Sequence, residues 1–394
     1  MRFFYVTAIF VFLDLAWWFV ADRIARRTVN PKCWRRIAGV TGGLALLGIG
    51  LLLLARMIGM KSMIMPELAV IAVFLWHFLI VLPAILVTLP FLAFGRKKPL
   101  AVVPPDAVPE GVPANVVVVS RRDFLNRGLI ALPPLAVAAL TAESKKNEDA
   151  LRQRNFDLPY KDLPPELDGL TIAHVTDPHL GSFITDAKVK NIIEMVNNID
   201  ADLVLQTGDL INQSLGDLPD GIEMLRKFRS RYGVYSCQGN HDCIDDREKF
   251  EAELPRAGLN LLLDEARIID VRGTKLRLMA PRWWGYKEDV IQWSVKELVP
   301  DQPDGLFNLL MVHHPHGFDT AAANNVHLTL SGHTHGGQVA LTQNIGVGPA
   351  MYRYWSGQYT KGDHQAIVSN GTGNWFPLRI NVPCEILKIT LHRA

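Results

Sequence analysis

The chain has 394 residues, which is enough for two domains, and a formal net charge of +2 at pH 7. This near-neutral balance argues against the basic surface of a nucleic-acid-binding protein, so no nucleic-acid partner is expected. The four cysteines include no CxxC pair, so neither a zinc knuckle nor a disulfide framework is indicated.

Residues 1–98 are dominated by apolar runs, and mean hydropathy over the whole chain is +0.13, a high value for a wholly soluble protein. Three segments, Phe3–Val20, Ile37–Leu54 and Leu68–Phe94, each have the length and composition of a transmembrane helix. We therefore expect residues 1–98 to form a transmembrane region of about three helices.

The loops that follow these three segments differ in positive charge. The cations, in chain order, are Arg23, Arg26, Arg27, Lys32, Arg35 and Arg36, then Arg56 and Lys61, then Arg96, Lys97 and Lys98. By the positive-inside rule the first and third loops are cytoplasmic and the N-terminus lies outside. Asp14 and His77 fall within the segments; such groups are functional candidates, although a residue near a segment end can instead extend to the interface.

Residues 99–119 are rich in proline and valine and are expected to form an extended linker. The next stretch, residues 120–143, contains Ser120-Arg-Arg-Asp-Phe-Leu125 followed by the apolar run Gly128–Ala142. This pattern resembles a twin-arginine export signal, although such signals normally begin a chain; the alternative is a fourth transmembrane anchor. Both interpretations place the residues after the run on the extracytoplasmic side of a bacterial cytoplasmic membrane.

Residues 144–394 have the composition of a globular domain, in which apolar runs predict strands and helical spacing predicts intervening helices. The expected strands are Gly169–Thr176, Ala201–Thr207, Tyr232–Cys237, Leu261–Asp270, Lys275–Met279, Leu306–Val312, Val326–Leu330, Ile367–Val368 and Cys384–Leu391. The expected helices are Lys188–Ile199, Ile222–Phe228 and Asp246–Leu254.

Five of these strands end in a cluster of Asp, His or Asn. Because strands that end together at one edge of a sheet bring their C-terminal residues into one crevice, the clusters are expected to converge. The clusters supply seven oxygen or nitrogen side chains: Asp177, His179, Asp209, Asn240, His313, His333 and His335. Such donors suit Mn²⁺, Fe or Zn²⁺, and seven exceed the four that one tetrahedral ion needs. We therefore predict two divalent metal ions.

These clusters, taken in order, resemble the signature of the calcineurin-like metallophosphoesterases. The blocks are Asp177-x-His179, Gly208-Asp209, Gly239-Asn-His-Asp242, His313 and Gly332-His-Thr-His335. Gly336-Gly-Gln-Val339 and the segment from Gly371 to Arg379 resemble the bacterial branch that joins this domain to membrane segments or twin-arginine signals. The resemblance implies an α/β fold, a β-sandwich flanked by helices (αββα), after the N-terminal α-helical transmembrane region.

The resemblance also implies a role for each site residue. Asp177, His179 and His335 would hold one metal, and Asn240, His313 and His333 the other, with Asp209 bridging; Mn²⁺ is the expected ion. A metal-bridging hydroxide would attack phosphorus in line. His241 would stabilise the transition state or protonate the leaving oxygen, and Asp242 would orient His241. His314 and Arg379 are weaker candidates for contact with substrate.

The expected function is hydrolysis of phosphomonoesters or phosphodiesters by a membrane-anchored enzyme, with a phosphorylated small molecule or lipid as substrate. One alternative is a pyrophosphatase for a nucleotide-linked lipid, such as a UDP-sugar-lipid, which would face the cytoplasm. Another is a non-catalytic membrane sensor with a phosphoesterase-like domain. The bilayer and, if the signal-like segment is used, the twin-arginine export machinery are the expected partners.

Overall fold

The computed structural model describes residues 2–57, 67–81, 83, 84, 86, 120–181, 183–299, 305–342 and 344–394. The chain divides into two compact units, residues 1–142 and residues 143–394. The predicted linker 99–119, the later part of the segment Leu68–Phe94 and the cations Lys61, Arg96, Lys97 and Lys98 lie outside the described residues.

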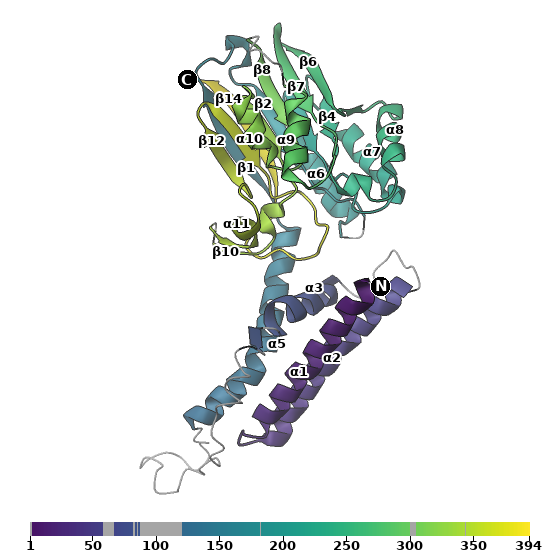
Figure 1. Ribbon diagram of the computed structural model, residues 1–394, viewed down its shortest axis with the longest axis vertical. Helices are drawn as coiled ribbons and strands as arrows, with labels where there is room; N and C mark the ends of the chain where they lie inside the picture. Colours follow the sequence, from purple (N-terminus) through teal and green to yellow (C-terminus); the bar gives the residue numbers. More distant parts are fainter. Residues whose placement is uncertain are drawn as a thin grey trace. The chain divides into compact units, whose positions relative to one another are not determined.

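The first unit is helical (Figure 1). Its elements are α1 Arg2–Ala25, α2 Pro31–Met57, α3 Glu67–Leu75 and the π-helix η1 Trp76–Val81, together with the first part of α5 Arg121–Asp149. Among the described residues, two helices are long and apolar enough to cross a membrane, Pro31–Leu54 and Arg121–Asp149.

The two ionisable residues of the apolar segments contact each other inside the first unit. His77 Nε2 lies 3.0 Å from Asp14 Oδ2, and the Trp76 indole donates to Asp14 Oδ1 at 2.7 Å. All three side chains are buried. Pairing of this kind is what makes a buried polar group tolerable in an apolar environment.

The second unit contains two six-stranded sheets. The first has the order β1-β14-β2-β3-β4-β5 and the second the order β12-β13-β9-β8-β7-β6, while β10 and β11 form a separate pair. Within the sheets β2, β3 and β4 run parallel, as do β7, β8 and β9. The strands are β1 Leu151–Tyr160, β2 Thr171–Val175, β3 Leu203–Thr207, β4 Val234–Cys237, β5 Asn260–Leu261, β6 Glu265–Val271, β7 Thr274–Ala280, β8 Phe307–Met311, β9 Leu328–Ser331, β10 Ala340–Thr342, β11 Ile345–Gly346, β12 Gly357–Lys361, β13 His364–Val368 and β14 Cys384–Arg393.

The two sheets pack face to face because their central strands are apolar on both faces. In β3, Leu203 and Leu205 join the core shared with Leu278 and Leu309 of the other sheet, whereas Val204 points to the opposite face. Successive side chains of a strand alternate between faces, so an unbroken apolar run predicts a strand covered on both sides.

Helices cover the two outer faces (Figure 1). The first sheet packs against α6 Asp186–Asn198, α7 Leu218–Lys227 and α8 Arg247–Arg256, and the second against α9 Glu288–Lys296 and α10 Gly317–Ala323. A short helix, α11 Val347–Met351, follows β11. The predicted αββα sandwich with flanking helices is therefore confirmed.

Two details of the predicted strands are wrong. The run Leu261–Asp270 is not one strand, because the chain turns at Asp264 with φ of 51° and passes from β5 in one sheet to β6 in the other. Strands β1, β10, β11 and β12 were not predicted; in β1 the first half is mostly exposed and polar.

Candidate metal centre

The strands bring the seven predicted ligands to one edge of the sandwich. Asp177 and His179 follow β2, Asp209 follows β3 and Asn240 follows β4 in the first sheet; His313 follows β8, and His333 and His335 follow β9 in the second. Each residue comes after the carboxyl end of a parallel strand, where the topology of such sheets places ligand sites. The structure thus brings all seven together.

Backbone strain is concentrated at these positions. Asp177, His179, Asp209, His333 and His335 all have positive φ, between 48° and 67°. Only a few per cent of non-glycine residues adopt this conformation, which Asn, Asp and His tolerate best, and it costs on the order of 1–3 kcal/mol at each position. In an extended chain these side chains would point to opposite faces of the sheet. The turns instead direct them all toward one region.

Glycines next to the ligands allow the loops to approach closely. A Cβ on Gly239 would lie 2.2 Å from Asp209 Oδ1, and a Cβ on Gly332 would lie 2.1 Å from Asp177 Oδ2. No side chain fits at these distances, so glycine is required at both positions.

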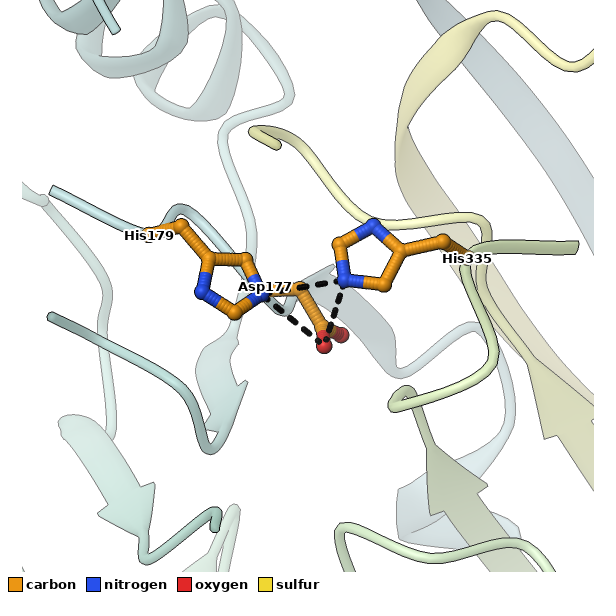
Figure 2. A group of neighbouring side chains, drawn as sticks. All are labelled: Asp177, His179 and His335. Atoms are coloured by element: carbon orange, nitrogen blue, oxygen red, sulfur yellow. Dashed lines mark hydrogen bonds and ion pairs between the residues drawn. The ribbon is translucent and has the colours of Figure 1, made fainter. Parts of the chain in front are cut away.

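Asp177, His179 and His335 form the first group of ligand atoms (Figure 2). The two Nε2 atoms of His179 and His335 lie 3.0 Å apart, and Asp177 Oδ1 lies 3.2 Å from His335 Nε2 and 3.8 Å from His179 Nε2. All three side chains are buried.

His313, His333 and Asn240 form the second group. The Asn240 Oδ1 atom lies 2.9 Å from His333 Nδ1 and 3.2 Å from His313 Nε2, and the two ring nitrogens are 3.2 Å apart. Asp209 joins the groups, because its Oδ2 atom lies 3.2 Å from His313 Nε2 and 3.6 Å from His179 Nε2.

This donor set fits two divalent cations. Each group converges imidazole nitrogens with a carboxylate or amide oxygen, the ligands that Mn²⁺, Fe and Zn²⁺ accept. A cation among them would satisfy lone pairs that otherwise face one another in a buried space. Asp209, between the groups, is the residue placed to contact both.

The protonation states of the ligand side chains are consistent with metal binding. Burial acts to raise the pKa of Asp177, but the His335 and His179 imidazoles outweigh it and hold that pKa well below its usual value. Burial lowers the pKa of His333 to about 3 and that of His335 to about 4, so both rings are neutral near pH 7. Burial would also lower the pKa of His313, but the Asp209 carboxylate raises it to about 9, so a cation must displace a proton there.

Asp242 does not orient His241, contrary to the prediction. Its carboxylate instead accepts three backbone N–H groups: Oδ2 from Asp209 and Gly239, both at 2.9 Å, and Oδ1 from Ile211 at 3.2 Å. Asp242 therefore fixes the backbone that carries Asp209. Burial and the nearby Asp209 carboxylate raise the pKa of Asp242 to about 8.

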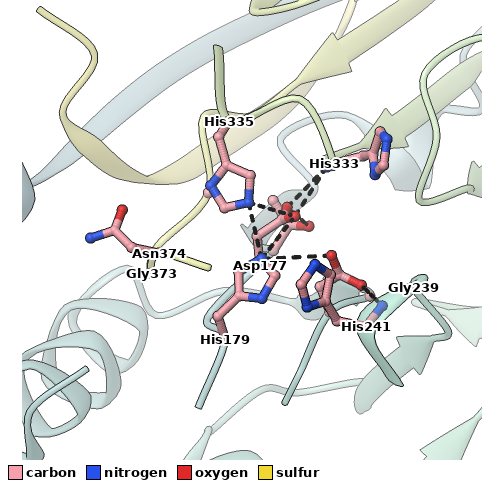
Figure 3. A network of polar contacts seen from close by, with 12 residues as sticks. Asp177, His179, Gly239, His241, His333, His335, Gly373 and Asn374 are labelled. Carbon is pink, nitrogen blue, oxygen red and sulfur yellow. Dashed lines mark hydrogen bonds and ion pairs between the residues drawn. The ribbon is translucent and has the colours of Figure 1, made fainter. Parts of the chain in front are cut away.

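His241 is oriented by a backbone group. Its Nδ1 contacts the Asn212 carbonyl oxygen, so Nδ1 carries the proton and Nε2 is left to accept or carry a second one. The His241 ring packs edge-on against His179, with ring centroids 4.5 Å apart. Figure 3 shows it beside the first group of ligand atoms. Burial lowers the pKa of His241. A carbonyl partner gives no residue-type signal in sequence, which is why Asn212 was missed.

Arg379 does not fit its predicted contact with substrate, because its side chain is 0% exposed. The guanidinium donates to the carbonyls of Asn370, Gly373 and Val382 and to Asn374, and Nη2 lies 2.9 Å from His335 Nδ1. Arg379 thus supports the ligand His335 from behind and holds the loop drawn with Asn374 in Figure 3.

His314 is also buried, but it borders the second group. Its ring centroid lies 4.6 Å from that of His333 and 6.4 Å from that of Trp283. Trp283 in turn lies 5.7 Å from His313 and 5.9 Å from His333, and Tyr352 lies 6.0 Å from His333. Trp283 and Tyr352 are therefore aromatic side chains that lie beside the ligands.

The chain resembles known proteins over this part of its length. Residues 170–337 match the family model of the calcineurin-like phosphoesterases. Residues 170–337 therefore form a calcineurin-like phosphoesterase domain. The phosphoesterase domain thus contains all seven candidate ligands within the matched residues, while Arg379 follows them.

Three relatives illustrate the similarity. A transmembrane protein with metallophosphoesterase domain from Danio rerio is 30% identical over 61% of this chain and 57% of its own length. The uncharacterized metallophosphoesterase YkuE of Bacillus subtilis is 28% identical over 58% of this chain and 81% of its own. An uncharacterized metallophosphoesterase of Helicobacter pylori is 29% identical over 59% and 63%. The chain thus spans little more than half the length of the zebrafish relative.

Proposed function

We propose that this protein is a membrane-anchored phosphoesterase that uses two divalent metal ions, most favourably Mn²⁺, to hydrolyse a phosphomonoester or phosphodiester. The observation that carries the proposal is the convergence of seven donors, six of them buried, from five strand ends on adjacent sites, with Asp209 between them. Bound cations would offset charge on the phosphoryl oxygens and lower the pKa of an attacking water.

The chain's own residues supply the rest of the chemistry. The turns that hold five of the seven ligands at positive φ fix them before substrate arrives, which lowers the reorganisation needed during reaction. His241 donates its Nδ1 proton to the Asn212 carbonyl, and one of its ring nitrogens lies within 4.8 Å of ligand atoms of His179 and Asp209. Because burial lowers the pKa of His241 and favours the neutral ring, Nε2 must first take up a proton; His241 is then the residue best placed to pass that proton to a leaving oxygen.

A lipid-linked phosphoester is the substrate class that we propose. Two of the described helices are long and apolar enough to cross a membrane, and the zebrafish relative is named as a transmembrane protein. Trp283 and Tyr352 beside His333 provide apolar surface at the metal centre. An enzyme tethered to a bilayer meets substrates in that bilayer at high local concentration.

The test uses the full chain in detergent with added Mn²⁺ and a chromogenic phosphodiester and phosphomonoester. Asp209→Asn should lower kcat/KM by more than about 100-fold, because even changes behind metal ligands cost roughly 10- to 100-fold. The metal content of the Asp209→Asn protein, measured on the same samples, should be lower than the two ions per chain expected for the wild type.

Asp157→Asn is the matched control, since Asp157 is an exposed carboxylate on β1. This variant should keep both activity and metal content. Hydrolysis that survives both Asp209→Asn and a chelator would refute the proposed site. A wild-type chain that binds two ions but hydrolyses neither substrate class would favour the alternative of a non-catalytic membrane sensor.

A further inference from the structure

The small β10–β11–α11 region carries a group of exposed apolar side chains. Leu341 is 77% exposed, Ile345 58% and Met351 66%, and Val347 is also exposed. These four residues, here called the apolar tip, lie within one short stretch of chain. Scattered single apolar residues are ordinary on a protein surface, but a cluster of large ones marks a contact with a partner or a membrane.

The apolar tip is joined directly to the metal centre. The 3₁₀ turn η6 His335–Gly337 begins at a ligand, and Val347 donates its backbone N–H to Val339 at 2.9 Å. A Cβ on Gly337 would lie 1.9 Å from the Gly348 nitrogen, so η6 and α11 are in backbone contact. The element that carries the tip therefore packs directly against the turn that begins at His335.

The tip is also joined to the end of α5. Ala340 donates to the Ile380 carbonyl at 3.0 Å, and Asn381 donates its side-chain amide to the Ala340 carbonyl at 2.9 Å. The neighbouring Arg379 N–H donates to Ser144 Oγ at 2.8 Å. A short ladder of hydrogen bonds thus connects the tip to the last turns of α5.

α5 is continuous from Arg121 to Asp149, and its apolar run ends at Ala142. Ser144 comes two residues later, which is about 3 Å along a helix axis. If α5 crosses the bilayer, as its length and composition allow, the segment bound to Ser144 lies at the bilayer interface. The tip, bound to that same segment, is then within reach of the lipid.

We propose that the apolar tip inserts into the membrane interface and holds the metal centre against the bilayer, so that the enzyme takes a lipid phosphoester directly from the membrane surface. The proposal rests on the function proposed above. Lipid is the occupant that the observations favour, because the tip adjoins the end of the chain's own membrane-crossing helix and offers apolar rather than charged side chains.

The first experiment locates the tip. The full chain, with the exposed Cys33 replaced by serine, carries an environment-sensitive fluorophore at Ile345→Cys or at Ile268→Cys. Ile268 is a matched control, since it is exposed on β6, which lies at the other end of the domain from β10 and α11 (Figure 1). The same background without an added cysteine gives the baseline.

In phosphatidylcholine vesicles, lipids that carry a nitroxide should quench the probe at position 345 strongly and the probe at 268 weakly. Equal access of both probes to an aqueous quencher would overturn the proposal. Shielding at 345 that depends on protein density but not on nitroxide lipid would assign the tip to a second copy instead, which also overturns it.

The second experiment tests the consequence for activity. In Leu341→Ser/Ile345→Ser/Met351→Ser, hydrolysis of phosphatidic acid in vesicles should fall about fivefold or more, while a soluble chromogenic ester is hydrolysed as in the wild type. Ile268→Ser should change neither rate. An equal loss on both substrates would indicate damage to the metal centre and refute the membrane role. If the wild type hydrolyses neither substrate, the proposed function fails, and the quenching result alone decides whether the tip contacts lipid.

Discussion

At the scale of single residues, Asp242 stabilises backbone loops and does not orient the adjacent His241. Its carboxylate accepts the N–H groups of Asp209, Gly239 and Ile211, so it holds the β3 and β4 loops together. Asp242→Asn removes one acceptor oxygen and places an NH₂ group against a backbone N–H. We expect this to destabilise the domain by about 1–3 kcal/mol and to weaken metal binding roughly 10- to 100-fold.

Calorimetric unfolding and metal titration of the full chain in detergent would measure both effects. The pH profile of kcat separates this role from the one predicted in sequence. If Asp242 acted by orienting His241, the substitution would shift that profile while stability and metal affinity stayed unchanged.

The residue scale also shows what sequence can specify. Ligand type and strand-end position were enough to predict which seven side chains converge, because the topology of parallel strands fixes where they meet. The partners behind the ligands were not predictable in the same way. Asn212 acts through its carbonyl, which every residue has, and Arg379 acts from a segment remote in sequence.

At the scale of elements, β2 contains a buried histidine, His174, from which we expect a pH-dependent contribution to stability. His174 Nε2 lies 2.8 Å from Thr207 Oγ1, and burial lowers the pKa of His174 to about 3. The unfolded chain binds this proton near pH 6.5 and the folded domain does not. Stability from His174 is therefore complete above pH 6.5 and is lost progressively as the pH falls toward 3.

His174→Gln tests this effect, because glutamine can keep the hydrogen bond to Thr207 but does not titrate. Between pH 6 and pH 4.5 the variant's free energy of unfolding should fall less steeply than that of the wild type, by up to about 1.4 kcal/mol per pH unit. Urea unfolding of the domain at several pH values measures the two slopes. Equal slopes would mean that His174 is protonated in the folded domain over this range.

Elements were predicted well where burial is complete and poorly where it is partial. β3 and β8 are buried throughout and appear in sequence as unbroken apolar runs. β1 is half exposed and its polar half carries no such pattern, while β10, β11 and α11 are too short for any periodicity. The turn at Asp264 begins a polar stretch, residues 264–267, that divides two apolar runs, and the prediction of one strand passed over this interruption.

At the scale of the whole molecule, orientation in the membrane decides which substrates the phosphoesterase domain meets. Within the first unit, Asp123 Oδ1 accepts the Val29 N–H at 2.7 Å, and Asn126 donates to the Arg27 carbonyl at 3.2 Å. The start of α5 is therefore bound to the arginine-rich loop between α1 and α2, so both lie on the same side of a bilayer. These contacts favour a fourth anchor that stays with the chain over a signal that is removed.

The positive-inside rule assigns that shared side to the cytoplasm, because both segments are rich in arginine. We therefore expect α5 to lead outward and the domain that follows it to be extracytoplasmic. An alkaline phosphatase reporter, which is active only outside the cytoplasm, should be active in a bacterial host when fused after Ala394. A reporter fused after Asn30, in the loop between α1 and α2, should be inactive and is the matched control. Green fluorescent protein at the same two positions should give the reverse pattern. Fluorescence of the Ala394 fusion, with no phosphatase activity there, would instead place the metal centre in the cytoplasm and favour a nucleotide-linked lipid as substrate.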